Sequence, residues 1–373
     1  MKINLPLFVF MLLTKLSFGQ QKSLLISTHL NTKAGKAVEK VSVVVDKVGT
    51  CITGNDGKCF YPTLRGIGMS VNIKASLSDY VPINNLELKS YRLSDQKIDT
   101  VRVIMSLIAE REKYALAYFE KETGIIIRKR FEEKEKSLYA QIKDLVAKMN
   151  DIKDKNNLAY QKLEKNLEEA NKRLELVQKD KLNQESIAQR LATTLSMLEG
   201  EEIPDYVSQA YSLFRQGKIK EADKVLQIDA IDNEVVKAKL MIKIGELGKK
   251  ILQNAIASYL FKAQLKIELN EYKQAEILFE KAYQADSNNA NTLYQYAYFL
   301  QKQNRAKRPA ELYERALMIR EALAKDNPQQ YLPYVANTLN NLGIFYSDNN
   351  LKEQAQKAYE RALMIYEALA KDN

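Results

Sequence analysis

The side chains best suited to acid–base, nucleophilic or metal chemistry are scarce in this sequence, which holds one histidine and two cysteines in 373 residues. A Ser-His-Asp or Cys-His catalytic site needs a histidine, and His29 stands beside Leu30 in a predicted strand, where a structural role is the stronger interpretation. A zinc site needs about four Cys, His or carboxylate ligands, usually in close pairs, and the sequence contains no such grouping. We therefore expect a protein that is not an enzyme and that uses no metal or cofactor.

The two cysteines flank a turn. Cys51 and Cys59 lie on either side of Thr53–Gly57, where Asn, Asp and Gly tolerate the positive φ angles of a tight hairpin. With four residues on each side of Asn55, the two sulfur atoms could face each other on neighbouring strands. An oxidising compartment favours a disulfide, and two reduced, buried thiols are the alternative. A redox-active pair is disfavoured because the CxxC spacing is absent from the sequence.

The first 19 residues have the pattern of a secretory signal. Lys2 precedes a short apolar run, Leu5–Leu13, and small residues follow at Ser17 and Gly19. Nine residues are too few for a membrane-spanning helix, which needs about 20. The pattern predicts cleavage after Gly19, a secreted or periplasmic protein and no transmembrane segment in the mature chain, and a buried N-terminal helix is the alternative.

The net charge of +10 does not by itself indicate a nucleic-acid partner. Basic residues are interleaved with acidic ones, as where Arg128-Lys129-Arg130 is followed by Glu132 and Glu133. Mixed charge of this kind is typical of a solvated helix face. We expect no binding to nucleic acid, and attraction to anionic lipid headgroups or glycans stays open.

Residues 20–107 read as a small all-β sandwich, because short runs rich in β-branched residues alternate with Gly, Asn, Asp and Pro turns. The predicted strands are Ser23–His29, Val41–Asp46, Lys58–Tyr61, Ser70–Ala75 and Thr100–Met105.

The same segment resembles the carboxypeptidase-regulatory-like sandwich. The resemblance rests on the opening Gly35–Val43, the hairpin Thr53–Phe60, Gly68 before a strand, and Ser78-Asp79-Tyr80, which departs from the family by having Asp79 in place of Gly. It implies a non-catalytic module common in exported bacterial proteins, and it adds no active site.

Residues 108–200 carry a heptad pattern of apolar residues with one four-residue slip near Asn156, and they are predicted to form a long coiled-coil helix. The stripe consists of Leu138, Ile142, Leu145, Met149 and Ile152, then Tyr160, Leu163, Leu167, Ala170, Leu174 and Val177, then Ala188, Leu191, Leu195 and Leu198. Such a stripe must be covered, and the sequence favours self-association into a homo-oligomer. A long helical hairpin folded back on itself is the alternative. Lys181 and Gln184 interrupt the stripe, so the seam could bend there.

An internal repeat marks the end of the chain. Tyr313–Asn327 recurs 46 positions later as Tyr359–Asn373, with Arg320 replaced by Tyr366. The second copy with its upstream residues resembles a tetratricopeptide repeat, through Leu342-Gly343, Tyr346, Ala355, Tyr359 and Ala362.

The same frame extends upstream over residues 201–373. The matching positions are Ala297, Tyr313 and Ala316, then Ala263, Ala275, Phe279 and Ala282, then Ala210 and Ala222. Steps of 53, 34 and 46 residues between units indicate insertions that lengthen helices, and Pro309 stands where the family prefers Ala. The resemblance implies an all-α solenoid of about four helix pairs with a groove for a protein partner.

The predicted groove residues come from the first helix of each unit, and they are Tyr211, Phe214, Leu260, Gln264, Asn291, Tyr294, Tyr298, Asn337, Asn340 and Ile344. Aromatic side chains supply contact area and amides bind a peptide backbone, although any of these tyrosines could instead pack between units. A carboxylate clamp is not supported, because Lys and Arg do not recur at these positions.

Taken together, these patterns predict a multidomain, exported, non-enzymatic scaffold that binds a protein partner through its repeat groove. The alternative is a glycan- or envelope-binding protein that uses the β-sandwich, with the helices as an oligomeric stalk.

Overall fold

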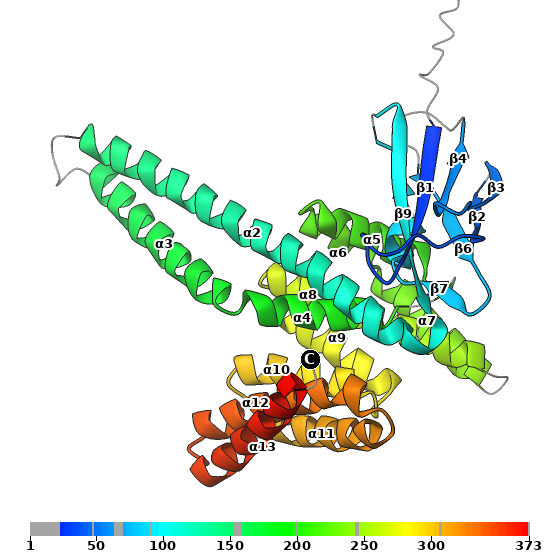
Figure 1. The fold of residues 1–373 in the computed structure, drawn as a ribbon. Helices are drawn as coiled ribbons and strands as arrows, with labels where there is room; N and C mark the ends of the chain where they lie inside the picture. Colours follow the sequence, from blue (N-terminus) through cyan, green and yellow to red (C-terminus); the bar gives the residue numbers. More distant parts are fainter. Residues whose placement is uncertain are drawn as a thin grey trace, which may run out of the picture.

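The computed structural model describes residues 23–371, apart from residues 47, 63–69, 90, 95, 153–157, 199, 201, 243–245 and 306–307. The predicted signal at residues 1–19, Gly68 and Asn156 lie outside the described residues. Figure 1 shows a β region, a long helical hairpin that projects from it, and a set of stacked helix pairs.

The β region is built from two main sheets and one short pair of strands. The four-stranded sheet has the order β4-β1-β9-β7, with the bounds Lys58–Tyr61, Ser23–Leu30, Ile98–Leu107 and Tyr80–Pro82. The three-stranded sheet has the order β3-β2-β6, with the bounds Gly49–Ile52, Ser42–Val45 and Ile73–Ser76. The short pair joins β5 (Ser70–Val71) to β8 (Tyr91–Arg92). A short helix, α1 (Asn85–Leu88), precedes β8.

Both main sheets contribute to one apolar core. Leu24 and Ile26 of β1 are buried together with Val43 and Val45 of β2, whereas Val44 between them is 38% exposed. This alternation is what a strand with one face on the core requires. The structure therefore has a small all-β unit in the segment where the sequence predicts one.

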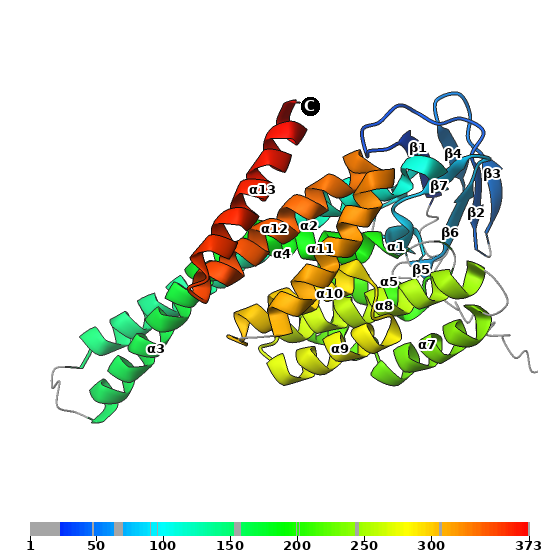
Figure 2. The same ribbon diagram turned by 90° about the horizontal axis from the view of Figure 1, so that it is seen from below.

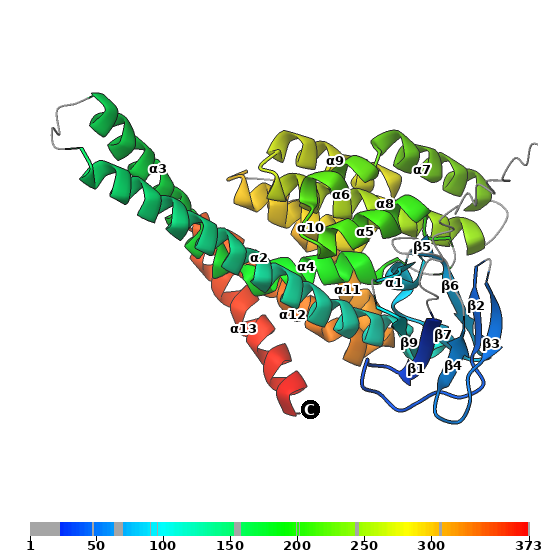
Figure 3. The same cartoon turned by 90° about the horizontal axis from the view of Figure 1, so that it is seen from above.

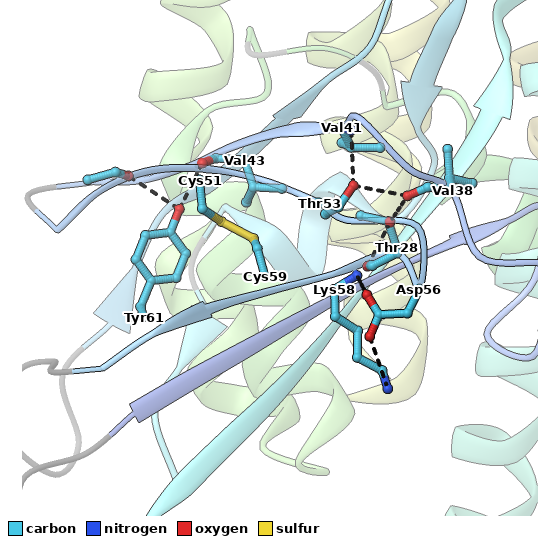
Figure 4. The surroundings of a disulfide bond; sticks show 12 residues. Thr28, Val38, Val41, Val43, Cys51, Thr53, Asp56, Lys58, Cys59 and Tyr61 are labelled. Atoms are coloured by element: carbon cyan, nitrogen blue, oxygen red, sulfur yellow. Dashed lines mark hydrogen bonds and ion pairs between the residues drawn. A yellow bond between two sulfur atoms is a disulfide. The ribbon is translucent and has the colours of Figure 1, made fainter.

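The disulfide joins the two main sheets rather than two paired strands of one sheet. Cys51 lies on β3 and Cys59 on β4, with 6.2 Å between their Cα atoms (Figure 4). The Tyr61 hydroxyl on β4 also donates a hydrogen bond to the carbonyl oxygen of Val43 on β2, at 2.7 Å. The pairing of neighbouring hairpin strands that the sequence suggested is replaced by this link between sheets, because β3 pairs with β2 and β4 pairs with β1.

The heptad segment forms an antiparallel hairpin. It begins directly after β9 with the three-residue turn η1 (Ile108–Glu110) and then forms α2 (Arg111–Asn150), α3 (Leu158–Lys181) and α4 (Gln184–Ser196). Gln178 of α3 donates a hydrogen bond to the Tyr139 hydroxyl of α2, and Lys181 pairs with Glu135 at 2.7 Å. These pairings place late α3 beside the middle of α2, as Figure 1 shows.

The apolar stripe is covered within the chain, so the structure adopts the hairpin alternative rather than the favoured self-association. Leu145 of α2 and Ala170 of α3 are buried, and the other described members of the stripe are buried or half-buried. The hairpin satisfies the heptad pattern without a second copy, because a heptad seam needs a partner helix and does not specify whose.

The base of the hairpin belongs to the same core as the first helix pair. Phe119 of α2 and Leu191 and Leu195 of α4 are buried in one apolar cluster. The cluster also includes Phe214 of the helix α5 (Asp205–Arg215) and Phe261 of the helix α8 (Glu246–Glu268). The predicted boundary at residue 200 therefore does not separate two cores.

In the part of the chain that the structure describes, the remaining helices form four pairs and one additional helix (Figures 2 and 3). The pairs are α5 (Asp205–Arg215) with α6 (Ile219–Val225), α8 (Glu246–Glu268) with α9 (Tyr272–Ala285), α10 (Ala290–Lys302) with α11 (Arg308–Asp326), and α12 (Pro328–Asp348) with α13 (Lys352–Lys371). The 53-residue step holds an additional helix, α7 (Ile228–Ile242), whereas the 46-residue step lengthens α11 and α12 to 19 and 21 residues.

The connection between the two helices of each pair contains a residue in the left-handed backbone conformation. The second residue after the first helix has a positive φ in all four pairs, at Gly217, Asn270, Asn304 and Asn350, with φ between 56° and 75°. Gly and Asn tolerate this left-handed conformation and commonly end helices. Pro309 lies at the second position of α11, where a proline costs the helix little because the first backbone N–H groups have no partner within the helix.

In the described residues, no helix combines the length and the apolar composition that a membrane crossing requires.

Candidate partner-binding groove

The surface formed by the first helices of the units is partly covered by α4 of the same chain. Gln189 accepts a hydrogen bond from the Asn337 amide of α12 at 2.9 Å, and the Thr194 hydroxyl accepts one from Gln295 of α10 at 2.7 Å. Figure 3 shows α4 lying between α2 and α10. The groove that the sequence predicted is therefore occupied over part of its length by the hairpin.

A buried arginine strengthens this contact. Arg190 of α4 is 7% exposed, and its guanidinium carbon lies 3.8 Å from the centre of the Tyr298 ring of α10. The guanidinium also donates to the Ser186 hydroxyl at 2.7 Å. A desolvated cation over an aromatic face stabilises a contact by about 2 kcal/mol.

Several predicted groove residues are buried instead: Tyr211 and Phe214 in the cluster shared with α2 and α4, and Leu260 in the cluster of the later helix pairs. Tyr211, Phe214 and Leu260 are 0–1% exposed, and the Tyr211 ring lies edge-on to Phe119 of α2 at 5.9 Å. Gln264 is buried and donates to Gln295 at 3.2 Å. In this conformation these four side chains are not accessible to a partner, which corrects the sequence-based assignment.

Two more predicted residues hold the site together rather than lining its open part. Tyr294 is 6% exposed and donates a hydrogen bond to the Asn337 side chain at 2.6 Å. Burial raises the pKa of the Tyr294 hydroxyl, so it remains protonated and able to donate near neutral pH. Asn291 donates to the sulfur of Met197 and lines a different hollow near η1.

The other four predicted residues, Tyr298, Asn337, Asn340 and Ile344, line one open cavity of about 590 Å³. It lies between α2 and α4 on one side and α10, α12 and α13 on the other, and we name it the amide cavity. Its name comes from the amide side chains that line it, among them Gln184, Gln189, Gln301, Asn337, Asn340 and Asn341.

The amides differ in how far they are already paired. Asn341 donates to Tyr294 at 2.9 Å and to the side chain of Asn337 at 2.8 Å, so these residues form a fixed network. Gln301 accepts a hydrogen bond from Tyr313 at 2.9 Å. The half-buried Asn340 makes no side-chain hydrogen bond with the residues that the structure describes, so its donor and its acceptor are both available to a ligand.

The charges around the amide cavity balance. Glu120 and Glu185 line it together with Arg128 and Lys302. Burial raises the pKa of the Glu120 carboxyl. This arrangement has no excess of basic side chains with which to clamp a carboxylate.

Comparison with known proteins supports the assignment of the helix pairs. The family model for the tetratricopeptide repeat matches residues 256–289 and 336–369, which fall on α8–α9 and α12–α13. The chain contains tetratricopeptide repeats.

Among solved structures, the chain is similar to the one described as the crystal structure of MamA. The match has 16% sequence identity and a TM-score of 0.27, and it covers 43% of this chain and 96% of that chain. No curated protein matches the sequence.

The pair α10–α11 lies between the two matched tetratricopeptide repeats and keeps the same pattern of residues. Ala297 and Tyr313 take the places of Gly343 and Tyr359 in the last repeat, and both are fully buried. At Gly343, an added Cβ would lie 2.7 Å from the Tyr359 ring, which shows how closely the two helices of that repeat approach.

Side chains that could perform chemistry are engaged elsewhere. The two ring nitrogens of His29 lie 3.1 Å from the Gly35 carbonyl oxygen and from the Ser27 hydroxyl, which agrees with a structural role. In the part of the chain that the structure describes, no group of three His, Cys, Asp or Glu side chains could hold a metal ion. The amide cavity can therefore bind, through hydrogen bonds and apolar contact, but its residues offer no nucleophile paired with a base.

Proposed function

We propose that this protein is an exported, non-enzymatic scaffold that holds a protein partner in the amide cavity of its tetratricopeptide repeats. The observation that carries the proposal is an open cavity of about 590 Å³ whose wall includes Tyr298, Asn337, Asn340 and Ile344. Cavities of this size bind ligands through a few well-placed polar groups and apolar contact.

Export is supported by two independent features. Residues 1–19 have the charged, apolar and small-residue order of a secretory signal. The bonded pair Cys51 and Cys59 fits a compartment where disulfides form and persist, such as the periplasm or the cell exterior. The β region, with its resemblance to carboxypeptidase-regulatory-like modules, would then be a non-catalytic part of an exported protein.

A site-specific photocrosslinking experiment tests the proposal. A photoreactive amino acid is placed at Ile344, which is 37% exposed and lines the cavity, in the full chain expressed in its native cells. We expect one protein to be crosslinked reproducibly, and we expect it in the secreted or periplasmic fraction.

The matched control is Met318 on α11, which is 64% exposed and does not line the cavity. Crosslinking of the same protein with equal yield from Met318 and Ile344 would contradict the site. Retention of the unprocessed chain in the cytoplasm would contradict export.

A further inference from the structure

The hairpin is a permanent wall of the amide cavity, and we infer that the cavity takes an uncharged, extended segment of a partner protein, held between the hairpin and the last two repeats. This inference rests on the proposed function and specifies the chemistry of its ligand. It is carried by three observations: the anchoring of α4, the composition of the cavity wall and the state of its aromatic rings.

The first observation concerns α4. Its apolar residues Leu191, Ala192 and Leu195 are 0–1% exposed and lie in the core shared by α2, α5 and α8. Exposing a fully buried leucine costs about 1.5–3 kcal/mol, so release of α4 would cost several kcal/mol before any ligand had bound. A partner therefore enters the space that α4 leaves open instead of replacing α4.

The second observation is the chemistry of the wall. Amide side chains come from both sides, with Gln184 and Gln189 on the hairpin and Asn340 and Asn341 on α12. An amide can donate and accept at once, which matches the alternating N–H and C=O groups of an extended peptide. Balanced charges give an acidic or basic ligand no net attraction, so we expect the bound segment to be uncharged.

A helical ligand would use this wall poorly. A helix pairs nearly all of its N–H and C=O groups internally, so the Asn340 amide and the Gln184 amide oxygen would be buried against it without partners. An unpaired buried polar group costs about 1–3 kcal/mol. An extended segment avoids this cost because its backbone groups are free to pair.

The third observation argues against a glycan. Sugar rings bind proteins by stacking on open aromatic faces, but the Tyr298 ring has Arg190 3.8 Å from its centre and the Lys302 ammonium 5.4 Å from its centre. Of the aromatic residues that line the cavity, Tyr298 is thus already covered by cations, and Tyr366, which is 43% exposed, leaves a sugar ring a single stacking partner.

Gly124 of α2 offers a test from the hairpin side. It lines the cavity, and a Cβ added there meets no atom within 4 Å. Gly124→Trp would therefore occupy part of the cavity without altering any amide, whereas Gly124→Ala adds little volume and favours the helix. The pair separates blocking of the cavity from a change in α2.

The experiment uses the full mature chain and a display library of random peptides of about eight residues, which span about 27 Å when extended. We expect the selected peptides to be uncharged and to show no helical periodicity. Their affinity for Gly124→Trp should fall by more than about tenfold, and for Asn340→Leu by about three- to tenfold, the worth of one hydrogen bond. Affinity for Gly124→Ala should stay within about twofold, because little cavity volume changes. Circular dichroism melting of each variant checks that the chain still folds.

Three results would overturn the inference: selection of charged or helical peptides, unchanged peptide affinity in folded Gly124→Trp, and saturable binding of neutral oligosaccharides with no peptide selected. Failure here is distinguishable from failure of the proposed function. If crosslinking from Ile344 still captures a partner protein, the scaffold role stands and only the assigned ligand chemistry is wrong.

Discussion

Two segments of this chain with nearly identical sequences differ in how far their side chains are buried. Residues 313–325 in α11 and residues 359–371 in α13 differ at one position, yet Leu317 is 8% exposed and its counterpart Leu363 is 57% exposed. Met318 and Met364 are exposed in both copies, at 64% and 69%. The difference therefore lies in one face of the helix, the face that α12 covers on α11.

The single substitution between the copies follows that difference. Arg320 is 4% exposed and donates to the Thr338 hydroxyl at 2.7 Å and to the Tyr334 carbonyl oxygen at 3.3 Å, both on α12. Its guanidinium carbon lies 4.5 Å from the centre of the Tyr294 ring. Tyr366 stands at the same place in α13 and lines the amide cavity instead. In a repeat array, the neighbouring helix decides which residues of a repeat belong to the core.

The largest difference in the free energy of unfolding should be that between alanine substitutions at Leu317 and at Leu363. Leu317→Ala should lower the free energy of unfolding by about 2–4 kcal/mol, because it leaves a cavity between α11 and α12. Leu363→Ala should change it by less than about 0.5 kcal/mol, as is usual for an exposed side chain. Urea unfolding followed by circular dichroism measures both, and equal losses would show that α13 is covered in solution.

Exchanging the residues at Arg320 and Tyr366 should give the next largest difference in the free energy of unfolding. Arg320→Tyr removes two hydrogen bonds and a ring contact from a buried site, and we expect a loss of about 1–3 kcal/mol. Tyr366→Arg places the guanidinium at a half-open position and should cost less than about 0.5 kcal/mol. The same unfolding assay applies, and a larger loss for Tyr366→Arg would reverse the comparison.

The contact between the two helices of the last repeat can be tested with a substitution that is expected to destabilise the native chain but to stabilise a chain that lacks the Tyr359 ring. Gly343→Ala should cost about 1 kcal/mol, because the added Cβ meets the Tyr359 ring and forces it to move. In a chain that already carries Tyr359→Ala, the same substitution should stabilise by about 0.5–1 kcal/mol, since alanine favours a helix. A double-mutant cycle of unfolding free energies measures this, and additivity of the two changes would exclude the contact.

The smallest effect concerns alkaline pH. Burial raises the pKa of the Tyr313 hydroxyl well above its usual value, whereas Tyr359, its counterpart, is 37% exposed. A raised tyrosine pKa contributes stability below pH 10, about the unfolded value, and this stability is lost as the pH rises toward the folded value. Tyr313→Phe should therefore flatten the loss of stability above pH 10 more than Tyr359→Phe does, when urea midpoints are compared at pH 8 and pH 11. Equal slopes in the two variants would contradict the difference in burial.

Much of the architecture was predictable because its signals are local. The spacing of Ala263, Phe279 and Ala282 within one helix pair predicted a tetratricopeptide repeat, and the family match at residues 256–289 confirms it. The stripe through Leu145 and Ala170 predicted a coiled coil and favoured self-association, whereas the structure has the hairpin alternative. The stripe could not specify its partner, since a hairpin and an oligomer bury the same heptad positions.

The position of α4 was not predictable from these patterns. The hydrogen bonds that hold it join residues 148 positions apart, Gln189 and Asn337, and 101 positions apart, Thr194 and Gln295. Such polar contacts have no period in the sequence. In the sequence Arg190 is also indistinguishable from a surface arginine, and only the structure shows its contact with the Tyr298 ring. For the same reason Tyr211 and Phe214 were assigned to a groove, although the signal for the first repeat was itself the weakest.

The continuity of β9 and α2 has a mechanical consequence. Only the turn Ile108–Glu110 separates the sheet from a helix of 40 residues, which is about 60 Å long, so the β region stands at the base of a lever. A tilt of the sheet by about 6° would sweep the far end of the hairpin through about 6 Å. Gly124 borders the cavity near the base of this helix, where the core shared with α4 anchors α2, so such a tilt would move the far end of the hairpin and leave the cavity wall almost in place.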